Sequence, residues 1–159
     1  MTHPLLTKRW LYRADQDFGF ASLSSGNGCE YYDQPCFFFQ QAAEKYLKAY
    51  LIHGDLPFEK IHDLLRLLEV CSQEDASFKE LEDEAAVLNR FYVETRYPEP
   101  VFVKFTREDM YKARSAVQKI QQLVRGKLGV DHEITTDEIK KAEEEADRQF
   151  RQQEKDAGE

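Results

Sequence analysis

The sequence predicts an all-α protein, an antiparallel up-and-down helical bundle of about five helices followed by a charged C-terminal helix. Apolar residues recur at steps of three and four along most of the chain, which is the period of an amphipathic helix. Glycine, proline and capping residues fall between these periodic segments. Strand-like alternation is confined to Val101–Phe105, which would have no partner strand, so we expect an extended loop there.

Length and composition fit a single domain with one core. The chain has 159 residues, of which 33% are charged and 13% aromatic, and its mean hydropathy is -0.68. No apolar run is long enough to span a membrane, and the start of the chain lacks the apolar segment of a signal peptide. The three cysteines, Cys29, Cys36 and Cys71, have no spacing typical of a disulfide framework. We therefore expect a cytoplasmic protein with reduced thiols.

The charge is distributed unevenly along the chain. The formal net charge is -8, and residues 131–159 carry eleven acidic against five basic side chains. The preceding 130 residues are nearly neutral, with nineteen acidic and seventeen basic side chains. This excludes a protein that grips long nucleic acid through a strongly basic surface, but not a small local site for RNA or a nucleotide. We expect a helical domain at residues 1–130 and an acidic helix or tail at 131–159.

The first two helices are predicted with clear boundaries. The first runs from residue 4 or 5 to 24, and its apolar stripe consists of Leu6, Trp10, Ala14, Phe18 and Ala21. The loop sequence SSGNG follows it. For the second helix, Asp33 is the expected cap, Pro35 suits the first turn and Gly54 supplies the stop.

Residues 36–54 form the central part of this second helix. They are apolar around most of the circumference, which predicts a buried helix at the middle of a bundle. The polar exceptions Gln41, Glu44, Lys45 and Lys48 share one face. One interpretation is a solvated face, with a Glu44–Lys48 pair worth a few tenths of a kcal/mol. The other is the cationic floor of a site, where the two lysines and the amide receive phosphate oxygens.

Four more helical segments follow. The segment around residues 61–71 is a short third helix with the apolar face Ile61, Leu64, Leu65, Leu68 and Cys71. After a break at residues 72–75, the fourth carries Phe78, Leu81, Ala85, Leu88 and Tyr92, and Pro98 and Pro100 end it. Thr106 and Asp109 predict a box-like cap for the fifth, which ends near Gly126. Thr136 is the expected cap of a last, mostly charged helix through roughly residue 153, with a thin stripe of Ile139, Ala142, Ala146 and Phe150.

Two further places could carry chemistry. Arg96 and Tyr97 lie where the fourth helix ends before the prolines. In one interpretation Arg96 is favoured there by the helix dipole and Tyr97 packs under the loop. In the other, Arg96 binds a phosphate with two hydrogen bonds and Tyr97 stacks on a base or donates a hydrogen bond. Arg90 could join the same face. His62 could be a capping or packing residue, or a general acid or base near neutral pH. No metal site and no cofactor are predicted, because ligand spacings and a glycine-rich phosphate loop are absent.

Four stretches of the sequence, taken in order, are similar to those of one known family. They are AxxDFGFA (residues 14–21), CFFFQQAAEKYLKAYL (36–51), HDLLRLLEVC (62–71) and LNRFYVETRYP (88–98). They resemble the HEPN domain family, in particular its prokaryotic branch encoded beside minimal nucleotidyltransferases. The resemblance covers about residues 8–128 and leaves the last thirty residues outside.

This resemblance implies an up-and-down helical bundle that is often a homodimer and that is similar to the substrate-binding domain of aminoglycoside nucleotidyltransferases. Some members are metal-independent ribonuclease toxins neutralised by a nucleotidyltransferase partner, and others are regarded as nucleotide-binding modules. The ribonucleases share an Arg-x4-6-His motif, in which His would move the 2′-hydroxyl proton and Arg would stabilise the phosphorane. Here the corresponding place holds Arg90-x6-Tyr97 with no His following, while Arg125-x6-His132 straddles a helix end and is taken as accidental.

The predicted function is therefore binding of a nucleotide or RNA, as part of a toxin–antitoxin-like pair with a nucleotidyltransferase. The implied binding residues are Gln41, Glu44, Lys45, Lys48, Arg90, Arg96 and Tyr97. The alternatives are a ribonuclease toxin with a degenerate motif, for which Arg96, Tyr97 and His62 are the catalytic candidates, and a ligand-free dimerising scaffold. We expect Lys45 or Lys48 to face the same cleft as Arg96. The tail could cover a neighbouring helix or lie over the basic site as a nucleic-acid mimic.

Overall fold

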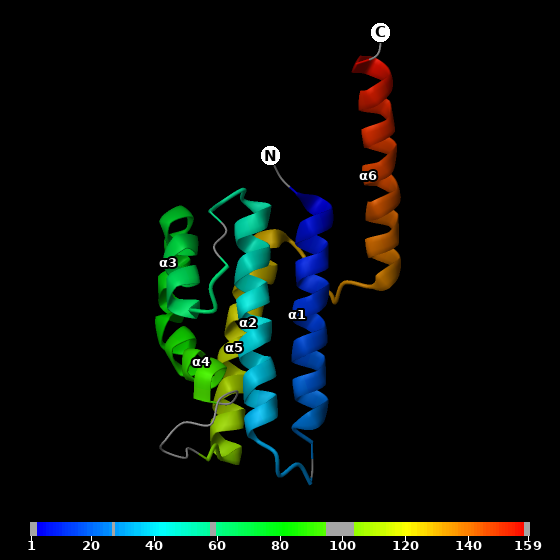
Figure 1. The fold of residues 1–159 in the computed structure, drawn as a ribbon. Coiled ribbons are helices and arrows are strands. Elements are labelled where there is room, and N and C mark those ends of the chain that lie inside the picture. Colours follow the sequence, from blue (N-terminus) through cyan, green and yellow to red (C-terminus); the bar gives the residue numbers. More distant parts are fainter. Residues whose placement is uncertain (1–2, 27, 58–59, 95–103, 158–159) are drawn as a thin grey trace.

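The protein forms an all-α bundle, as the sequence predicts. The computed structural model describes residues 3–26, 28–57, 60–94 and 104–157, with the backbone alone at 93 and 94. In chain order the elements are α1 (Pro4–Ser24), α2 (Asp33–His53), α3 (Leu64–Glu74), the short 3₁₀ helix η1 (Ala76–Leu81), α4 (Glu82–Glu94), α5 (Arg107–Leu128) and α6 (Thr136–Ala157) (Figure 1). These described residues contain no strand. Residues 101–103, Pro98 and Pro100 lie outside them, so the expected extended passage stays a prediction.

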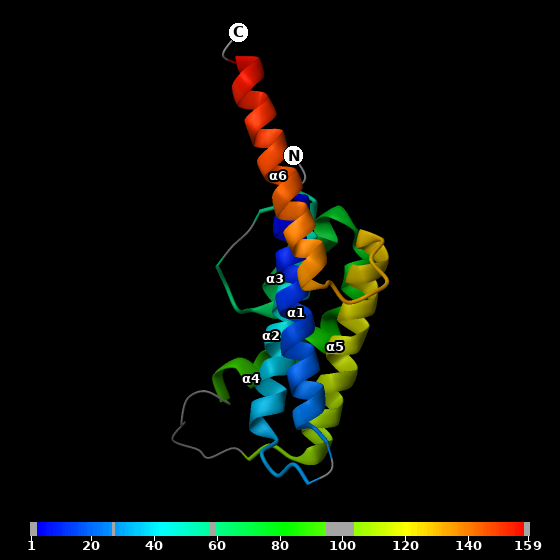
Figure 2. The same ribbon diagram turned by 90° about the vertical axis from the view of Figure 1, so that its right-hand side faces the viewer.

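Helix α2 is the centre of the bundle. It packs against α1, α3, α4 and α5, which surround it in both views (Figures 1 and 2). Most of its apolar side chains are buried, and Phe39, Tyr46 and Leu47 are completely so. Burying one such side chain stabilises a fold by about 1.5–3 kcal/mol. Helix α2 buries many of them because it contacts four helices at once. The prediction of a buried central helix is confirmed.

The ends of α1 and α2 agree with the sequence, except at one cap. Helix α1 begins at Pro4 and ends at Ser24. Helix α2 begins at Asp33 itself: its N-cap is Tyr32, and no side chain caps it. The prediction that Asp33 caps α2 is therefore wrong, although an acidic side chain in the first turn still favours the helix dipole. Gly54 is the C-cap, as expected.

The segment between α2 and α4 is less regular than the sequence predicts. Helix α3 begins only at Leu64, because Asp63 is its cap and accepts hydrogen bonds from the backbone N–H of Leu65 at 3.0 Å and of Arg66 at 3.3 Å. His62 therefore precedes the helix instead of starting it. The expected fourth helix is divided, since Asp75 caps the separate 3₁₀ turn η1 before α4 begins.

The last two helices are longer than predicted. The Thr106–Asp109 capping box of α5 is present, but α5 continues through Gly126 and stops at Gly129, whose φ of 66° favours glycine. The cap of α6 is Thr135, one residue earlier than expected: its hydroxyl accepts from the Glu138 N–H at 3.2 Å, and its own N–H donates to the Glu138 carboxylate at 2.8 Å. Helix α6 continues to residue 157.

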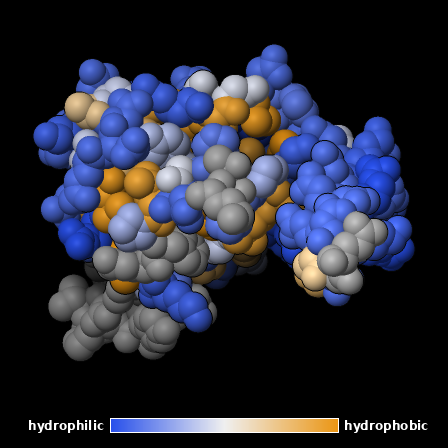
Figure 3. Space-filling model, turned by 90° about the horizontal axis from the view of Figure 1, so that it is seen from above, coloured by the Kyte–Doolittle hydropathy of each residue, from blue (hydrophilic) through white to orange (hydrophobic). Residues whose placement is uncertain are grey.

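Helix α6 lies outside the bundle. It packs against α1, none of its residues is buried, and its C-terminal part extends beyond the start of α1 (Figures 1 and 2). Seen from above, the α6 side of the molecule is almost entirely hydrophilic, whereas apolar side chains gather over the bundle (Figure 3). The tail thus covers a neighbouring helix, α1. No helix in the described ranges is long and apolar enough to cross a membrane.

Candidate functional site

The polar stripe of α2 is not a solvated face. The side chains of Glu44 and Lys48 are 6% and 5% exposed, and Gln40, one turn before Glu44, is fully buried. The predicted i,i+4 pair is present, with the Lys48 ammonium 2.6 Å from a Glu44 carboxylate oxygen. Removing charges from water is costly, so a buried ion pair must be well placed and further hydrogen-bonded. Loss of one partner of such a pair is therefore more destabilising than at a surface pair.

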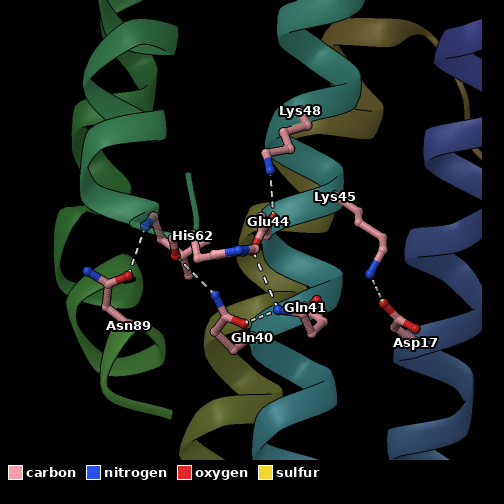
Figure 4. A network of polar contacts seen from close by, with 9 residues as sticks. Asp17, Gln40, Gln41, Glu44, Lys45, Lys48, His62 and Asn89 are labelled. Atoms are coloured by element: carbon pink, nitrogen blue, oxygen red, sulfur yellow. Dashed lines mark hydrogen bonds and ion pairs between the residues drawn. The ribbon is translucent and has the colours of Figure 1, made fainter. Parts of the chain in front are cut away.

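Glu44 is the hub of a polar network between α2 and the segment before α3 (Figure 4). One carboxylate oxygen binds Lys48, and the other lies 3.0 Å from Nδ1 of His62 and 3.5 Å from the Gln41 amide nitrogen. The Gln41 amide also donates to the Gln40 side-chain oxygen at 2.7 Å. The buried carboxylate therefore has partners on both oxygens, which offsets the loss of its hydration.

The backbone around His62 is held from two sides. The Gln40 amide donates to the His62 carbonyl at 3.3 Å. On the opposite side, Asn89 of α4 accepts from the Leu64 N–H and donates to the Asp63 carboxylate, both at 2.8 Å. The cap of α3 is thus fixed between α2 and α4, so the position of the imidazole is set by three helices.

His62 itself stays open to solvent. Its side chain is 48% exposed, whereas that of Glu44 is 6% exposed. The imidazole stacks on the ring of Tyr92 with centroids 4.3 Å apart and planes 15° apart. Within the described part of the chain, its Nε2 has no hydrogen-bond partner. When a neutral imidazole donates from Nδ1 to a carboxylate, Nε2 is left as an acceptor.

The two lysines of the stripe point in different directions. Lys45 reaches across to Asp17 of α1 and forms an ion pair there, while Lys48 turns towards Glu44 (Figure 4) and lies 5.7 Å from the centre of the Trp10 ring. Both ammonium groups thus face carboxylates. A shared cationic floor for phosphate is not what these side chains form.

The remaining predicted residues are only partly described. Arg90 is exposed on α4, with its guanidinium 5.5 Å from the Phe91 ring centre and 5.2 Å from that of Phe105. Arg96 and Tyr97 lie outside the described residues, so a cleft shared by Arg96 with Lys45 or Lys48 stays a prediction.

Sequence reasoning missed Gln40, Asn89 and Tyr92. Tyr92 fitted the apolar stripe of the fourth helix and was assigned to the core. Gln40 and Asn89 each break an apolar row, and that interruption was the signal that could have found them. A polar residue in a buried row needs partners, and both residues find theirs around the α3 cap.

A second buried polar cluster joins α1, α2, α5 and the start of the tail. Asp15 accepts from the Tyr46 hydroxyl at 2.6 Å, from the Ile134 N–H at 3.2 Å and from the Arg125 guanidinium. Burial and the nearby Asp15 carboxylate raise the pKa of Tyr46 far above its ordinary value. Arg125 also donates to the carbonyl oxygen of His132, so the two residues of the formal Arg-x6-His match meet through the backbone and build no catalytic pair.

The cysteines do not contribute a nucleophile to either cluster. Burial raises the pKa of Cys36 and of Cys71 to about 12, so both thiols stay protonated near neutral pH. Cys29 is half-buried in the loop after α1, and all three thiols are free. Among the described residues, no group of three or more His, Cys, Asp or Glu side chains is placed to hold a metal ion.

The fold and the site define a class of protein: a small antiparallel helical domain whose central helix carries a buried acid–base cluster that reaches solvent through one histidine. The HEPN domain model matches residues 7–127, and the chain therefore belongs to the HEPN domain family. Both polar networks begin on helices inside that region.

Two solved structures are similar to the bundle. TT1696 from Thermus thermophilus is 30% identical, with a TM-score of 0.68, and the match covers 76% of this chain and 97% of that one. ST0689, an archaeal HEPN homologue, is 25% identical, with a TM-score of 0.61, over 76% of this chain and 96% of its own. Among curated proteins, no match was found. Helix α6 lies beyond the region that the family match covers.

Proposed function

We propose that the protein is a HEPN-type module that binds a nucleotide or an RNA nucleotide at His62 and Tyr92. The observation that carries the proposal is the half-exposed imidazole, stacked on Tyr92 and bonded to buried Glu44. Every nucleobase has a π face, so aromatic side chains, histidine included, bind bases by stacking. The Nε2 of this half-exposed imidazole can in addition bond a hydroxyl or a base edge.

The other predicted binding residues have supporting roles in this proposal. Gln41 is half-buried beside Glu44, and its amide can contact a ligand that reaches the network. Arg90 lies on α4, the helix that also carries Tyr92, and together with Arg96 and Tyr97 it would bind the phosphate. Glu44, Lys45 and Lys48 would position other groups, since their charges already face partners.

Titration of the purified protein with ATP, AMP and short RNA, followed by calorimetry and thermal shift, tests the proposal. We expect His62→Ala and Tyr92→Ala to weaken binding by about tenfold each, because a stacked aromatic is worth about 1–3 kcal/mol per base. His132→Ala is the matched control, since His132 is 55% exposed and belongs to the start of the tail, outside the His62 network. A flat response to millimolar nucleotide and to RNA would support the ligand-free scaffold instead.

A metal-independent endoribonuclease is the second candidate, and the 3.0 Å contact between Glu44 and His62 favours it. Nε2 of His62 would take the proton of a ribose 2′-hydroxyl, and the freed oxygen would attack the adjacent phosphorus. The bond from phosphorus to the 5′-oxygen would break, and that oxygen would take up a proton from water. The products are a 2′,3′-cyclic phosphate and a 5′-hydroxyl. Glu44 would be a positioning residue, and Arg96 the group that stabilises the phosphorane.

Structured RNA incubated with the protein in EDTA distinguishes the two candidates. Cleavage that disappears in both His62→Ala and Arg96→Ala would support the ribonuclease. In Glu44→Gln, an altered pH profile of the residual cleavage is the expected signature of a positioning carboxylate. If RNA binds but stays intact in the wild-type protein, the ribonuclease is excluded and the binding module stands.

The proposal includes a homodimer and a minimal nucleotidyltransferase partner, as in a toxin–antitoxin pair in the cytoplasm. Membership of the HEPN family supports the dimer. The partner is suggested by the resemblance of the sequence to the branch encoded beside minimal nucleotidyltransferases. An adjacent short nucleotidyltransferase gene, and co-purification of its product with this chain, would support the pairing. Light scattering of the isolated protein tests the dimer, and a monomer at micromolar concentration would contradict it.

A further inference from the structure

A pocket lies between α1 and α6, on the other side of α1 from the His62 network (Figure 1). Its volume is about 340 Å³, which falls in the range of small-molecule sites. One wall is the face of α1 that carries Arg9, Tyr12 and Arg13, and the other is the first two turns of α6. The α6 wall consists of Thr136, Ile139, Lys140 and Glu143.

The two walls are held together at the base and near the far end. At the base, Ile134 is 5% exposed and its N–H donates to buried Asp15 at 3.2 Å. Near the far end, the Arg9 guanidinium lies 2.5 Å from the Glu143 carboxylate. The start of α6 is therefore fastened to α1, so the pocket belongs to the folded state.

The pocket combines an apolar interior with cationic edges. The Tyr12 ring and Ile139 both pack partly against the core and supply the apolar walls. Arg13 lies over the Tyr12 ring at 6.0 Å and bonds only the neutral Gln16, at 3.2 Å. Within the described ranges, neither Arg13 nor Lys140 has a carboxylate partner, although the chain carries a net charge of -8.

These features fit one class of ligand. Arginine binds phosphate through a planar fork of donors, and lysine adds a point charge. A flat organic body of nucleoside size fits the volume and the Tyr12 and Ile139 walls. We propose that the α1–α6 pocket binds a small phosphomonoester, with Arg13 and Lys140 on the phosphate and Tyr12 and Ile139 against the body. Because α6 lies outside the family match, this site is an addition to the HEPN domain.

Isoleucine methyl NMR of the full chain separates this site from the one at His62. The sequence has five isoleucines: Ile139 lies in the pocket, Ile61 adjoins His62 and Ile120 is buried in the core. Titration with AMP is expected to shift the Ile139 methyl saturably and to leave Ile120 in place. Inorganic phosphate should shift it at higher concentration, and adenosine should bind at least about tenfold more weakly than AMP.

Three variants test the roles of the cations. Arg13→Ala and Lys140→Ala should each weaken AMP binding by about tenfold, because each removes a charge-assisted contact. Lys141→Ala is the matched control: it removes the same charge one residue further along α6, outside the pocket, and should change the dissociation constant by less than about twofold. All three positions are exposed, so folding is expected to be unaffected.

Several results would overturn the proposal. An Ile139 methyl that stays in place at about 10 mM AMP excludes a useful site. Equal affinity for adenosine and AMP would mean that the phosphate contributes nothing. Equal effects of Lys140→Ala and Lys141→Ala would reduce the binding to nonspecific charge. A shift of Ile61 alone would assign AMP to the His62 site and leave the α1–α6 pocket without a ligand.

Discussion

Two buried carboxylates, Asp15 of α1 and Glu44 of α2, share their chemistry but differ in access to solvent. Asp15, with a side chain 5% exposed, binds Arg125, 12% exposed, together with the Tyr46 hydroxyl and the Ile134 N–H. Glu44, 6% exposed, binds Lys48, 5% exposed, and His62, 48% exposed. Each carboxylate has one largely buried cation, and of the two clusters only that of Glu44 continues to a half-exposed side chain.

This difference separates a structural connection from a site. In the Asp15 cluster every acceptor is filled by a buried or backbone donor, so the cluster ties α1, α2, α5 and the start of the tail together. In the Glu44 cluster the carboxylate orients an imidazole that is half exposed to solvent. A buried charge thus connects helices in one place and holds a half-exposed imidazole in the other.

The largest expected effect is on stability, at the closed cluster. Asp15→Ala leaves the largely buried Arg125 without this counter-charge and should lower the free energy of unfolding by about 3–5 kcal/mol. Urea denaturation followed by Trp10 fluorescence measures this. The control is Asp17→Ala on the same helix, whose partly exposed pair with Lys45 should be worth about 1 kcal/mol or less. Equal losses in the two variants would refute a structural role for the Asp15 cluster.

Next in size is the effect of separating the buried charges of the open cluster. Glu44→Ala removes the carboxylate that lies 2.6 Å from the buried Lys48 ammonium and should cost about 3 kcal/mol. Replacing both residues in Glu44→Met/Lys48→Met should recover most of this loss, because a buried pair can be exchanged for apolar side chains of similar volume. Nucleotide or RNA binding should not recover with it, since His62 still lacks its carboxylate. Recovery of both would remove Glu44 from the site.

A smaller stability effect is expected at the open end of the same cluster. His62→Ala gives up a stacked ring and a half-exposed hydrogen bond, so the free energy of unfolding should fall by about 1 kcal/mol or less. Ligand binding, measured on the same sample, should weaken by about tenfold. A large loss of stability with unchanged binding would instead make His62 a packing residue, which was the simpler interpretation of the sequence.

The smallest effect concerns the start of α6 and depends on pH. Glu138 and Asp131 raise the pKa of His132. The stability that protonated His132 contributes is therefore complete below the ordinary histidine pKa and is lost as the pH rises through the raised pKa. His132 and the Thr135 N–H lower the pKa of Glu138 from 4.5 to about 2, so its contribution is present above pH 4.5 and lost towards pH 2. The ion pair between His132 and Glu138 is therefore strongest between about pH 4.5 and 6.5.

The effect of this ion pair on the start of α6 can be measured as local helicity from the carbon chemical shifts of residues 136–142. We expect slightly lower helicity at pH 8.5 than at pH 5.5, and no such difference in His132→Ala. Asp15→Ala serves as the comparison, because Asp15 also holds the start of the tail through the Ile134 N–H. If Asp15→Ala changes the helicity of α6 less than the change in pH does, the His132–Glu138 pair is the more important of the two contacts.

Much of the fold could be predicted because local patterns are repeated in this chain. Steps of three and four placed the helices, and Thr106 with Asp109 identified a cap that the structure contains. The errors fell at boundaries, such as Asp33, Gly126 and Thr136, where neighbouring residues compete for one capping role. Of the candidate site, His62, Glu44, Lys48 and Gln41 were among the predicted residues, but their arrangement was not.

The sequence by itself determined the helical class, the central place of α2, the charged outer tail and the resemblance that the HEPN family match confirms. All of these depend on periodicity, composition or motif order, which are local properties of the chain. Only the tertiary structure decided that Glu44 and Lys48 are buried, that Lys45 turns to Asp17 and that His62 meets both Glu44 and Tyr92. Helical spacing fixes the direction of a side chain but not what stands opposite, and here α1, α3 and α4 made one stripe into two separate sets of contacts.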